Sequence, residues 1–302
     1  MSIHKIIIGW KCFYCHNKKY HFFHNINGYE LVICNKCKIL QTNVSSIMIK
    51  KINKKRYNDI YLSNYENIRF KYLTKFFIEK IKIIDKCVKG GNLLDYGCST
   101  GSFIDLINRV SRYKWNLYGL DINSKSINKA LQKIKANYHM GILKKNLYKN
   151  NYFDVISCFD VLEHDMNLQN SLKIINSILK PGGILLIQVP NYESVMCKLA
   201  GNDWDWWCLP DHIFHFSYES LKNILLKNNF VIRKTISWVS FYDFAINIKG
   251  HIKKNLPKYL FINQIIAKIS KIPLFILWII LVVLQKWNRS GGLLFILATK
   301  KS

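Results

Sequence analysis

Leu-Leu-Asp-Tyr-Gly-Cys-Ser-Thr-Gly-Ser-Phe, residues Leu93–Phe103, is the stretch around which the rest of the chain is organised. A short apolar run ends in Asp95, Gly97 and Gly101 bracket a tight turn, and a helical pattern follows from Ser102. A strand that breaks into a glycine turn at its carboxyl end is where open α/β sheets bind ligands. The spacing Asp-x-Gly-x-x-x-Gly is neither the Gly-x-Gly-x-x-Gly dinucleotide fingerprint nor a phosphate-binding loop that ends in Gly-Lys-Ser/Thr.

Strand and helix patterns alternate around this stretch. The strands predicted after it are 116–120, 138–143, 153–159 and 184–189, with late strands at 230–238 and 293–299. The predicted helices are 65–87, 102–110, 124–135, 168–179 and 218–228. Apolar strands that alternate with helices predict a parallel sheet covered on both faces. Asp121 follows the second strand, where a carboxylate can accept both ribose hydroxyls of an adenosine; its alternative role is a helix N-cap.

Composition bounds the class of protein. Half of the 302 residues are hydrophobic, which allows a sizeable core, and the formal net charge is +27. Such a charge favours an anionic partner, nucleic acid or a lipid surface, although a general bias toward Lys, Asn and Ile also produces it. Nine cysteines is an odd number, and the apolar run at 6–8 is too short for a signal peptide. We therefore expect reduced thiols and a cytoplasmic location.

The N-terminal segment carries two Cys-x-x-Cys pairs, Cys12–Cys15 and Cys34–Cys37, separated by 18 residues. Four thiolates at this spacing predict a zinc ribbon over residues 1–50, with a closed, structural site. The alternatives are buried reduced thiols or one redox-active pair. Residues 1–56 hold eleven Lys/Arg against one acid, Glu30, so the ribbon either reads an RNA substrate or packs on the main domain.

Three later motifs carry a family resemblance. They are Phe153-Asp-Val-Ile, Asp160-Val-Leu-Glu-His164 and Leu179-Lys-Pro-Gly-Gly-Ile184. With Leu93–Phe103 they resemble the motifs of class I S-adenosylmethionine (SAM) methyltransferases, and most closely the ubiquinone-biosynthesis O-methyltransferase branch. The cysteine pairs and the run 210–217 are also similar to bacterial methyltransferases with an N-terminal zinc module, many of which act on sugars, polysaccharides or secondary metabolites.

The resemblance implies a Rossmann-like seven-stranded sheet over residues 51–302 and SAM as the cofactor. The cofactor-binding residues that it implies are Arg69, Asp95, Gly97, Cys98, Gly101, Asp121, Ile122 and Phe159. Two positions depart from the family pattern. Ser99 stands where the middle glycine is usual, and the acid that often meets the adenine amine is missing near Ile142.

Methyl transfer to a hydroxyl requires a base, since the proton of the hydroxyl must leave. The candidates are His164, His212 and His215, with a purely structural role as the alternative for His164. The resemblance also implies that Asp160, Glu163 and His164 bind a divalent metal such as Mg²⁺, which would polarise the acceptor oxygen. The same acidic cluster could instead cap a helix.

An insertion at 240–290 precedes the last strand and contains thirteen uncharged residues, 272–284. This run is too short to span a bilayer. It predicts either a helix of segment 258–288 that lies in an anionic membrane interface or a lid over the active site. The resulting prediction is O-methylation of a small-molecule or a lipid- or sugar-linked acceptor. The alternatives are an RNA methyltransferase and a non-catalytic binding module with the same fold.

Overall fold

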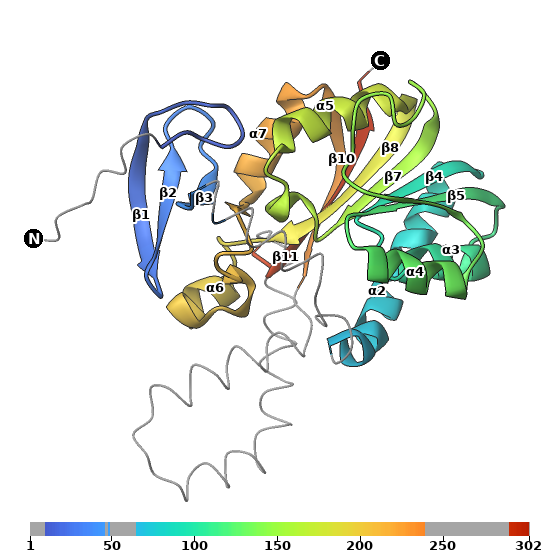
Figure 1. Cartoon of the computed structure of the whole chain (residues 1–302), viewed down its shortest axis with the longest axis horizontal. Helices are drawn as coiled ribbons and strands as arrows, with labels where there is room; N and C mark the ends of the chain where they lie inside the picture. The colour runs from blue at the N-terminus through green and yellow to red at the C-terminus, as the bar shows by residue number, and fades with distance from the viewer. Residues whose placement is uncertain (1–9, 46–47, 49–64, 239–289, 302) are drawn as a thin grey trace, which may run out of the picture.

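The computed structural model describes residues 10–45, 48, 65–238 and 290–301. A seven-stranded sheet of order β10-β11-β8-β7-β4-β5-β6 forms its centre (Figure 1). The strands of this sheet are β4 (Gly91–Tyr96), β5 (Trp115–Asp121), β6 (Asn137–Met140), β7 (Phe153–Phe159), β8 (Leu179–Pro190), β10 (Phe230–Trp238) and β11 (Leu293–Lys300). The α-helices that the structure describes are α2 (Tyr65–Cys87), α3 (Ser102–Val110), α4 (Ser124–Lys133), α5 (Leu168–Ile178), α6 (Val195–Ala200) and α7 (Tyr218–Lys227).

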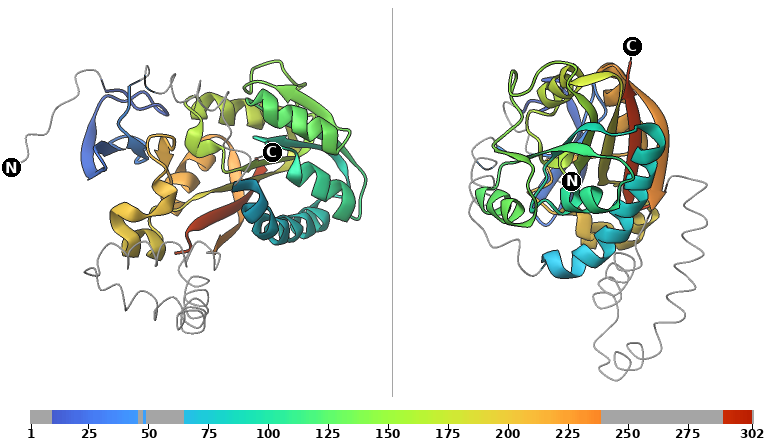
Figure 2. Two further views of the ribbon diagram at one scale, coloured as in Figure 1. Left: turned by 60° about the horizontal axis from the view of Figure 1, so that its bottom comes forward. Right: turned by 90° about the vertical axis from the view of Figure 1, so that its right-hand side faces the viewer.

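Helices cover both faces of the sheet, as predicted (Figures 1 and 2). On one face, an apolar cluster joins the sheet to α2, α3 and α4. On the opposite face, another cluster joins it to α5 and α7. Leu94 and Ile156 are paired in register on the adjacent parallel strands β4 and β7, and neither side chain is exposed. Strands that are buried on both faces are rich in apolar residues. This composition is why the strand limits predicted from the sequence lie close to the observed ones.

The sheet ends in an antiparallel edge. Strand β11 runs antiparallel to both β8 and β10. Strand β8 is therefore the last strand of the parallel part of the sheet. The predicted insertion 240–290 falls almost entirely on residues 239–289, which lie outside the described part of the chain. None of the described helices is long and apolar enough to cross a membrane.

A second sheet, of order β1-β2-β3-β9, contains the N-terminal module. Its strands are β1 (Tyr20–Ile26), β2 (Tyr29–Cys34), β3 (Leu40–Thr42) and β9 (Phe214–His215). The three strands of the module are completed by one strand from the second half of the chain. Leu40 pairs with His215 and Gln41 pairs with Phe214. The module is therefore joined to the segment that carries two of the candidate bases, His212 and His215.

Helix and strand limits differ from the sequence prediction at one informative place. The sequence predicted a helix over 168–179 and a strand over 184–189 with a gap between them, but α5 ends at Ile178 and β8 begins at once with Leu179. Leu179 pairs with Phe153, and the pairing resumes at Ile184 and Val155 after a register shift. Pro181 and Gly182 therefore lie within an irregular start of the strand rather than in a separate turn.

Candidate active site

The glycine loop after β4 is held against the tip of β5. Gly97 and Gly101 have φ values of 79° and 71°, in the left-handed region that favours glycine. The backbone N–H groups of Gly97 and Cys98 both donate to the carbonyl oxygen of Leu120, at 2.7 and 3.1 Å. Ser99, at the position of the usual middle glycine, also has a positive φ of 47°, so serine adopts the backbone shape that the loop requires.

Asp121 orders this loop from the end of β5. Its carboxylate accepts hydrogen bonds from the backbone N–H groups of Ser99 and Asn123, each at 2.8 Å. The alternative role for Asp121, capping the next helix, belongs to Asn123, whose side chain accepts from the N–H of Ser126 at 3.0 Å. Burial raises the pKa of Asp121 despite these bonds. Ile122 follows directly and is partly exposed.

Asp95 is the buried acid at the end of β4. It is 4% exposed, and its Oδ1 accepts a hydrogen bond from the hydroxyl of Ser157 at 2.6 Å. Burial raises the pKa of Asp95 to about 7, and the nearby Asp121 carboxylate acts in the same direction. A cationic ligand beside these two acids would favour their charged forms.

Phe159, at the end of β7, lies in an aromatic cluster. Its ring centroid is 5.1 Å from that of Phe103, 5.6 Å from Phe77 and 5.7 Å from Phe76. Cys98 is buried beside the loop, and burial raises the pKa of its thiol. Arg69 belongs to α2, but its side chain lies outside the described residues.

The predicted histidines lie together near the end of β7. His164 is in the short 3-10 helix η1 (Leu162–His164), and its ring centroid is 4.6 Å from that of His212. His164 Nδ1 is 2.9 Å from the carbonyl oxygen of Asp211, and His212 Nδ1 is 2.8 Å from that of Trp206. A carbonyl can only accept, so both Nδ1 atoms carry the proton.

His215 has a different environment from the other two histidines. Thr42 of β3 donates its hydroxyl hydrogen to the carbonyl oxygen of His212 at 2.7 Å. His215 Nε2 must then donate to Thr42 Oγ1, which lies 2.9 Å away. Burial, and the neighbouring His212, lower the pKa of His215 well below its usual range. His215 is therefore a neutral imidazole anchored to the N-terminal module.

Glu163 completes a group with His164 and His212. One ligand-type atom from each of the three side chains lies within 4.8 Å of the other two. The carboxylate of Asp160 accepts two hydrogen bonds from the amide of Gln188, each at 3.2 Å. The structure thus brings two members of the predicted Asp160–Glu163–His164 set together with His212, and ties Asp160 to β8.

The four cysteines of the N-terminal module converge. The Sγ atoms of Cys12 and Cys37 are 3.6 Å apart, and those of Cys15 and Cys34 are 3.5 Å apart. Sulfurs of a tetrahedral zinc site with bonds of about 2.3 Å are about 3.8 Å apart, so the four thiols fit that ion. Gln41 Nε2 donates to Cys12 Sγ at 2.9 Å, which links the cysteine cluster to β3.

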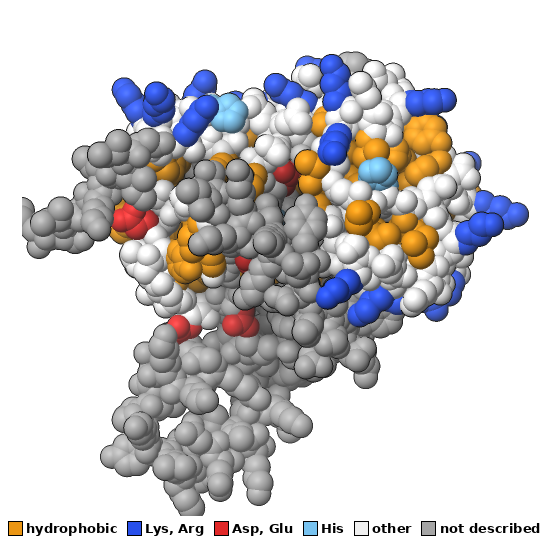
Figure 3. Space-filling model, in the orientation of Figure 1, with side chains coloured by type: hydrophobic (Ala, Val, Ile, Leu, Met, Phe, Trp, Pro, Cys, Tyr) orange, Lys and Arg blue, Asp and Glu red, His pale blue; other side chains and the backbone are white. Residues whose placement is uncertain are grey.

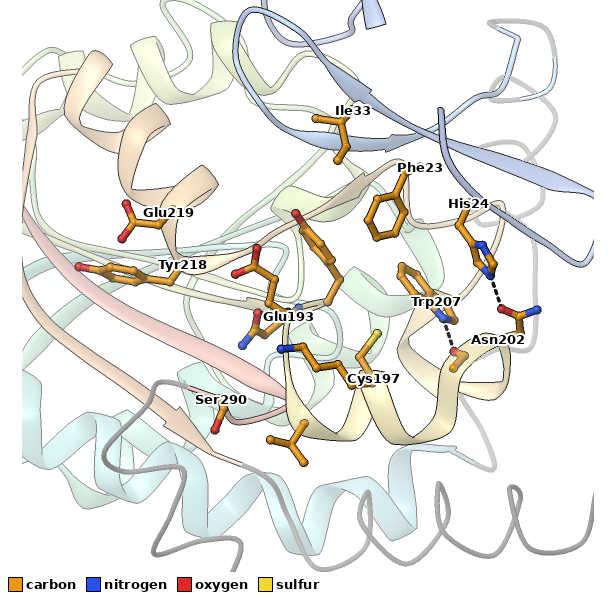
Figure 4. Close-up of a pocket in the computed structure, with 15 residues that line it drawn as sticks. Phe23, His24, Ile33, Glu193, Cys197, Asn202, Trp207, Tyr218, Glu219 and Ser290 are labelled. Carbon is orange, nitrogen blue, oxygen red and sulfur yellow. Dashed lines mark hydrogen bonds between the residues drawn. The ribbon is translucent and has the colours of Figure 1, made fainter. Parts of the chain in front are cut away.

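A cavity of about 1040 Å³ lies between the N-terminal module and the main domain (Figure 4). Phe23 and His24 of β1 face it from one side, and Glu193, just after β8, from the other. Tyr192 also lines the cavity. The remaining lining residues are Ile33, Asn191, Val195, Cys197, Lys198, Gly201, Asn202, Trp207, Tyr218, Glu219 and Ser290. The charged side chains among them are two glutamates and one lysine.

Three of the residues that line the cavity, Asn191, Tyr192 and Glu193, follow directly after the carboxyl end of β8. Phe159 of β7 is paired with Gln188 of β8 in adjacent parallel strands, so the carboxyl ends of the two strands are neighbours. The role of β1, and of Thr42 behind the histidines, could not be read from the sequence. Thr42 and the His212 carbonyl are 170 residues apart in the chain, and the local sequence around neither residue predicts this hydrogen bond.

Comparison with known proteins agrees with this geometry. The sequence pattern of a methyltransferase-domain family matches residues 65–235. The ubiquinone biosynthesis O-methyltransferase of Pelagibacter ubique is 26% identical over 219 residues, which cover 64% of this chain and 88% of the relative. A protein of Methanocaldococcus jannaschii is 28% identical over 214 residues, covering 68% and 76%. The fold is similar to that of a SAM-dependent methyltransferase from Archaeoglobus fulgidus, with a TM-score of 0.53, 19% identity and coverage of 80% and 100%.

Proposed function

Since the chain belongs to the family of class I SAM-dependent methyltransferases, we propose that it methylates a hydroxyl group of an uncharged acceptor. The acceptor is a small molecule or a lipid- or sugar-linked one. The observation that carries this proposal is the cavity at the carboxyl end of β8. The relative named as an O-methyltransferase supports a hydroxyl as the methylated group.

The lining of the cavity supports the acceptor class. Aromatic faces such as Phe23 and Tyr192 stack on the apolar faces of flat or sugar rings, and carboxylates and amides accept hydroxyl hydrogens. Glu193 and Glu219 outnumber the single cation, Lys198, in a chain with a net charge of +27. This local charge disfavours a polyanion at the cavity, and therefore supports an uncharged acceptor over RNA.

The surface agrees with this choice. On the face shown in Figure 3, Lys and Arg side chains are scattered around the margin rather than gathered in one patch. Nucleic-acid-binding surfaces concentrate their basic residues along the path of the phosphates. The segment 258–288, proposed from sequence as a membrane contact or a lid, lies outside the described residues.

The cofactor would bind across the ends of β4, β5 and β7. In this proposal Asp95 and the loop Gly97–Gly101 lie at the methionine end of SAM. Asp121 and Ile122 lie along the adenosine, and Phe159 packs against the cofactor. The four cysteines hold a structural zinc ion, for which their sulfur spacing is suitable.

Methyl transfer from a sulfonium is an in-line displacement, so positioning the acceptor against the methyl group supplies most of the rate. The acceptor hydroxyl loses its proton as the oxygen–carbon bond forms. His164 and His212 are the groups available to promote this loss, because each already holds a proton on Nδ1 and directs Nε2 away from its carbonyl partner. His215 supports them by anchoring the segment to Thr42.

Substitution in the cavity tests the proposal with a control in the same strand. Phe22 and Phe23 are neighbours in β1 with similar exposure, 41% and 42%, but only Phe23 lines the cavity. The assay uses labelled SAM and the extract fraction that accepts the methyl group. We expect Phe23→Ala to lower kcat/KM for that acceptor about tenfold, by analogy with the loss of an aromatic contact. SAM affinity should not change, and Phe22→Ala should behave as the wild type. Equal effects of the two substitutions would contradict the proposed acceptor site.

A further inference from the structure

We propose, resting on the methyl transfer proposed above, that Glu163, His164 and His212 bind a divalent transition-metal ion. This second site would be separate from the four cysteines, and its ligands are two imidazoles and one carboxylate. It differs from the hard-ligand set Asp160–Glu163–His164 that the sequence suggested. The third ligand comes from the segment before β9 rather than from the end of β7.

The hydrogen bonds of the two histidines favour metal binding. Metal-ligating histidines commonly donate one ring N–H to a backbone carbonyl, which fixes the tautomer and leaves the other nitrogen as the ligand. Both rings have this arrangement: His164 donates to Asp211 and His212 donates to Trp206, at 2.9 and 2.8 Å. Two independent backbone carbonyls therefore prepare both Nε2 atoms as ligands.

The carboxylate supplies the charge that the ion needs. Glu163 is 1% exposed and His212 is 5% exposed, and buried carboxylates are paired or coordinate metals. The three ligand-type atoms lie within 4.8 Å of one another. Ligands of a tetrahedral ion with bonds of about 2.1 Å are about 3.4 Å apart, so small side-chain rotations bring all three onto one ion.

The donor set selects the kind of metal. Imidazole nitrogens suit Zn²⁺, Fe²⁺, Co²⁺ or Ni²⁺, whereas Mg²⁺ prefers oxygen ligands. Asp160, the additional oxygen ligand that Mg²⁺ would require, has both carboxylate oxygens bonded to Gln188. Two His and one carboxylate leave positions open, as catalytic sites do. When bound there, the ion would lower the pKa of an acceptor hydroxyl, so His164 and His212 would promote proton loss as its ligands rather than as bases.

The N-terminal module fixes the third ligand. Ile213 donates its N–H to the carbonyl oxygen of Glu163 at 2.8 Å, and Thr42 donates its hydroxyl to the carbonyl oxygen of His212 at 2.7 Å. The peptide group that joins His212 to Ile213 is thus bonded through its N–H to η1 and through its carbonyl oxygen to β3. The cysteine cluster, through β3, holds the second site in shape.

Metal stoichiometry of the full chain tests the site without measuring turnover. The protein is dialysed against Co²⁺, or against Mg²⁺ in a parallel arm, and the metal bound per chain is measured together with the absorption spectrum. Thiolate-bound cobalt gives sulfur-to-metal charge-transfer bands, so the four-cysteine site is counted separately and reports correct folding of each variant. His212→Ala and Glu163→Gln test the ligands. Asp160→Asn and His139→Ala, which changes an exposed histidine of β6, are the controls.

We expect two cobalt ions per chain in the wild type and in both controls. His212→Ala and Glu163→Gln should retain the thiolate bands and bind one ion. One ion in the wild type, two ions in His212→Ala, loss of the second ion in Asp160→Asn, or preferential filling by Mg²⁺ would each overturn the site. Two ions without methyl transfer would refute the proposed function alone, whereas one ion with methyl transfer would refute only the metal site.

Discussion

Substitution of Gly97 by alanine should destabilise the protein for two separable reasons. A Cβ atom at Gly97 would lie 2.1 Å from Cγ2 of Val161, and the residue has a φ of 79°. A non-glycine residue in the left-handed region costs about 1–2 kcal/mol, and overpacking of this kind costs about 1–3 kcal/mol more. We therefore expect Gly97→Ala to lower the free energy of unfolding by about 2–5 kcal/mol.

Gly182 provides the matched control. It has a φ of 71°, but a Cβ atom there would meet nothing within 4 Å, so Gly182→Ala should cost only the backbone term, about 1–2 kcal/mol. Shortening the partner in Gly97→Ala/Val161→Ala should recover about 1–3 kcal/mol of the steric cost as a coupling energy. Urea denaturation of Gly97→Ala, Gly182→Ala, Val161→Ala and the double variant gives these values. Equal costs for Gly97→Ala and Gly182→Ala, or zero coupling with Val161, would refute the reasoning.

Three further predictions concern the cofactor, the metal and the histidines. Burial raises the pKa of Asp95 to about 7, and cationic SAM favours the ionised carboxylate. SAM affinity should thus rise with pH up to about 7 and level off above it. Calorimetry in buffers of different ionisation enthalpy should detect proton release near pH 6.5 that Asp95→Asn abolishes. Cys34→Ser should lose the zinc ion and the hydrogen-exchange protection of β1–β3 but keep SAM affinity, since the cofactor loop belongs to the other sheet; a matching loss of SAM affinity would contradict this. Thr42→Val leaves the His212 carbonyl and His215 Nε2 without their partner. It should lower stability by about 1–3 kcal/mol in denaturant titration and lower kcat at unchanged SAM affinity, and an unaltered kcat would contradict the anchoring role.

The sequence predicts the parallel sheet well because its determinants are local. Strands such as β4 and β7 contain short apolar segments whose residues are buried, and Asp95 and Gly97 mark the turn that ends β4. What the sequence could not predict depends on pairing between distant segments. Gln41 and Phe214 are joined in the second sheet, and neither residue lies in a pattern that points to the other.

The site shows the same division. The residues around the glycine loop were predicted from their spacing together with the family resemblance, and the structure shows that Ser99 adopts a positive φ of 47° there. The ligand role proposed for His212 and the anchoring role of Thr42 follow from three-dimensional contacts alone. Glu163 and His164 were selected for their motif, but the partner that the structure gives them lies almost fifty residues further along the chain.

Transfer of a tritiated methyl group from SAM into fractionated cell extract tests the central claim most directly. The full chain is incubated with labelled SAM and with the small-molecule, lipid, glycan and RNA fractions, and calorimetry confirms SAM binding in the same preparation. We predict label in a small-molecule, lipid or glycan fraction, in a form expected of a methyl ether, and none in RNA. Label confined to RNA, or no label in any fraction from protein that binds SAM, would contradict the account.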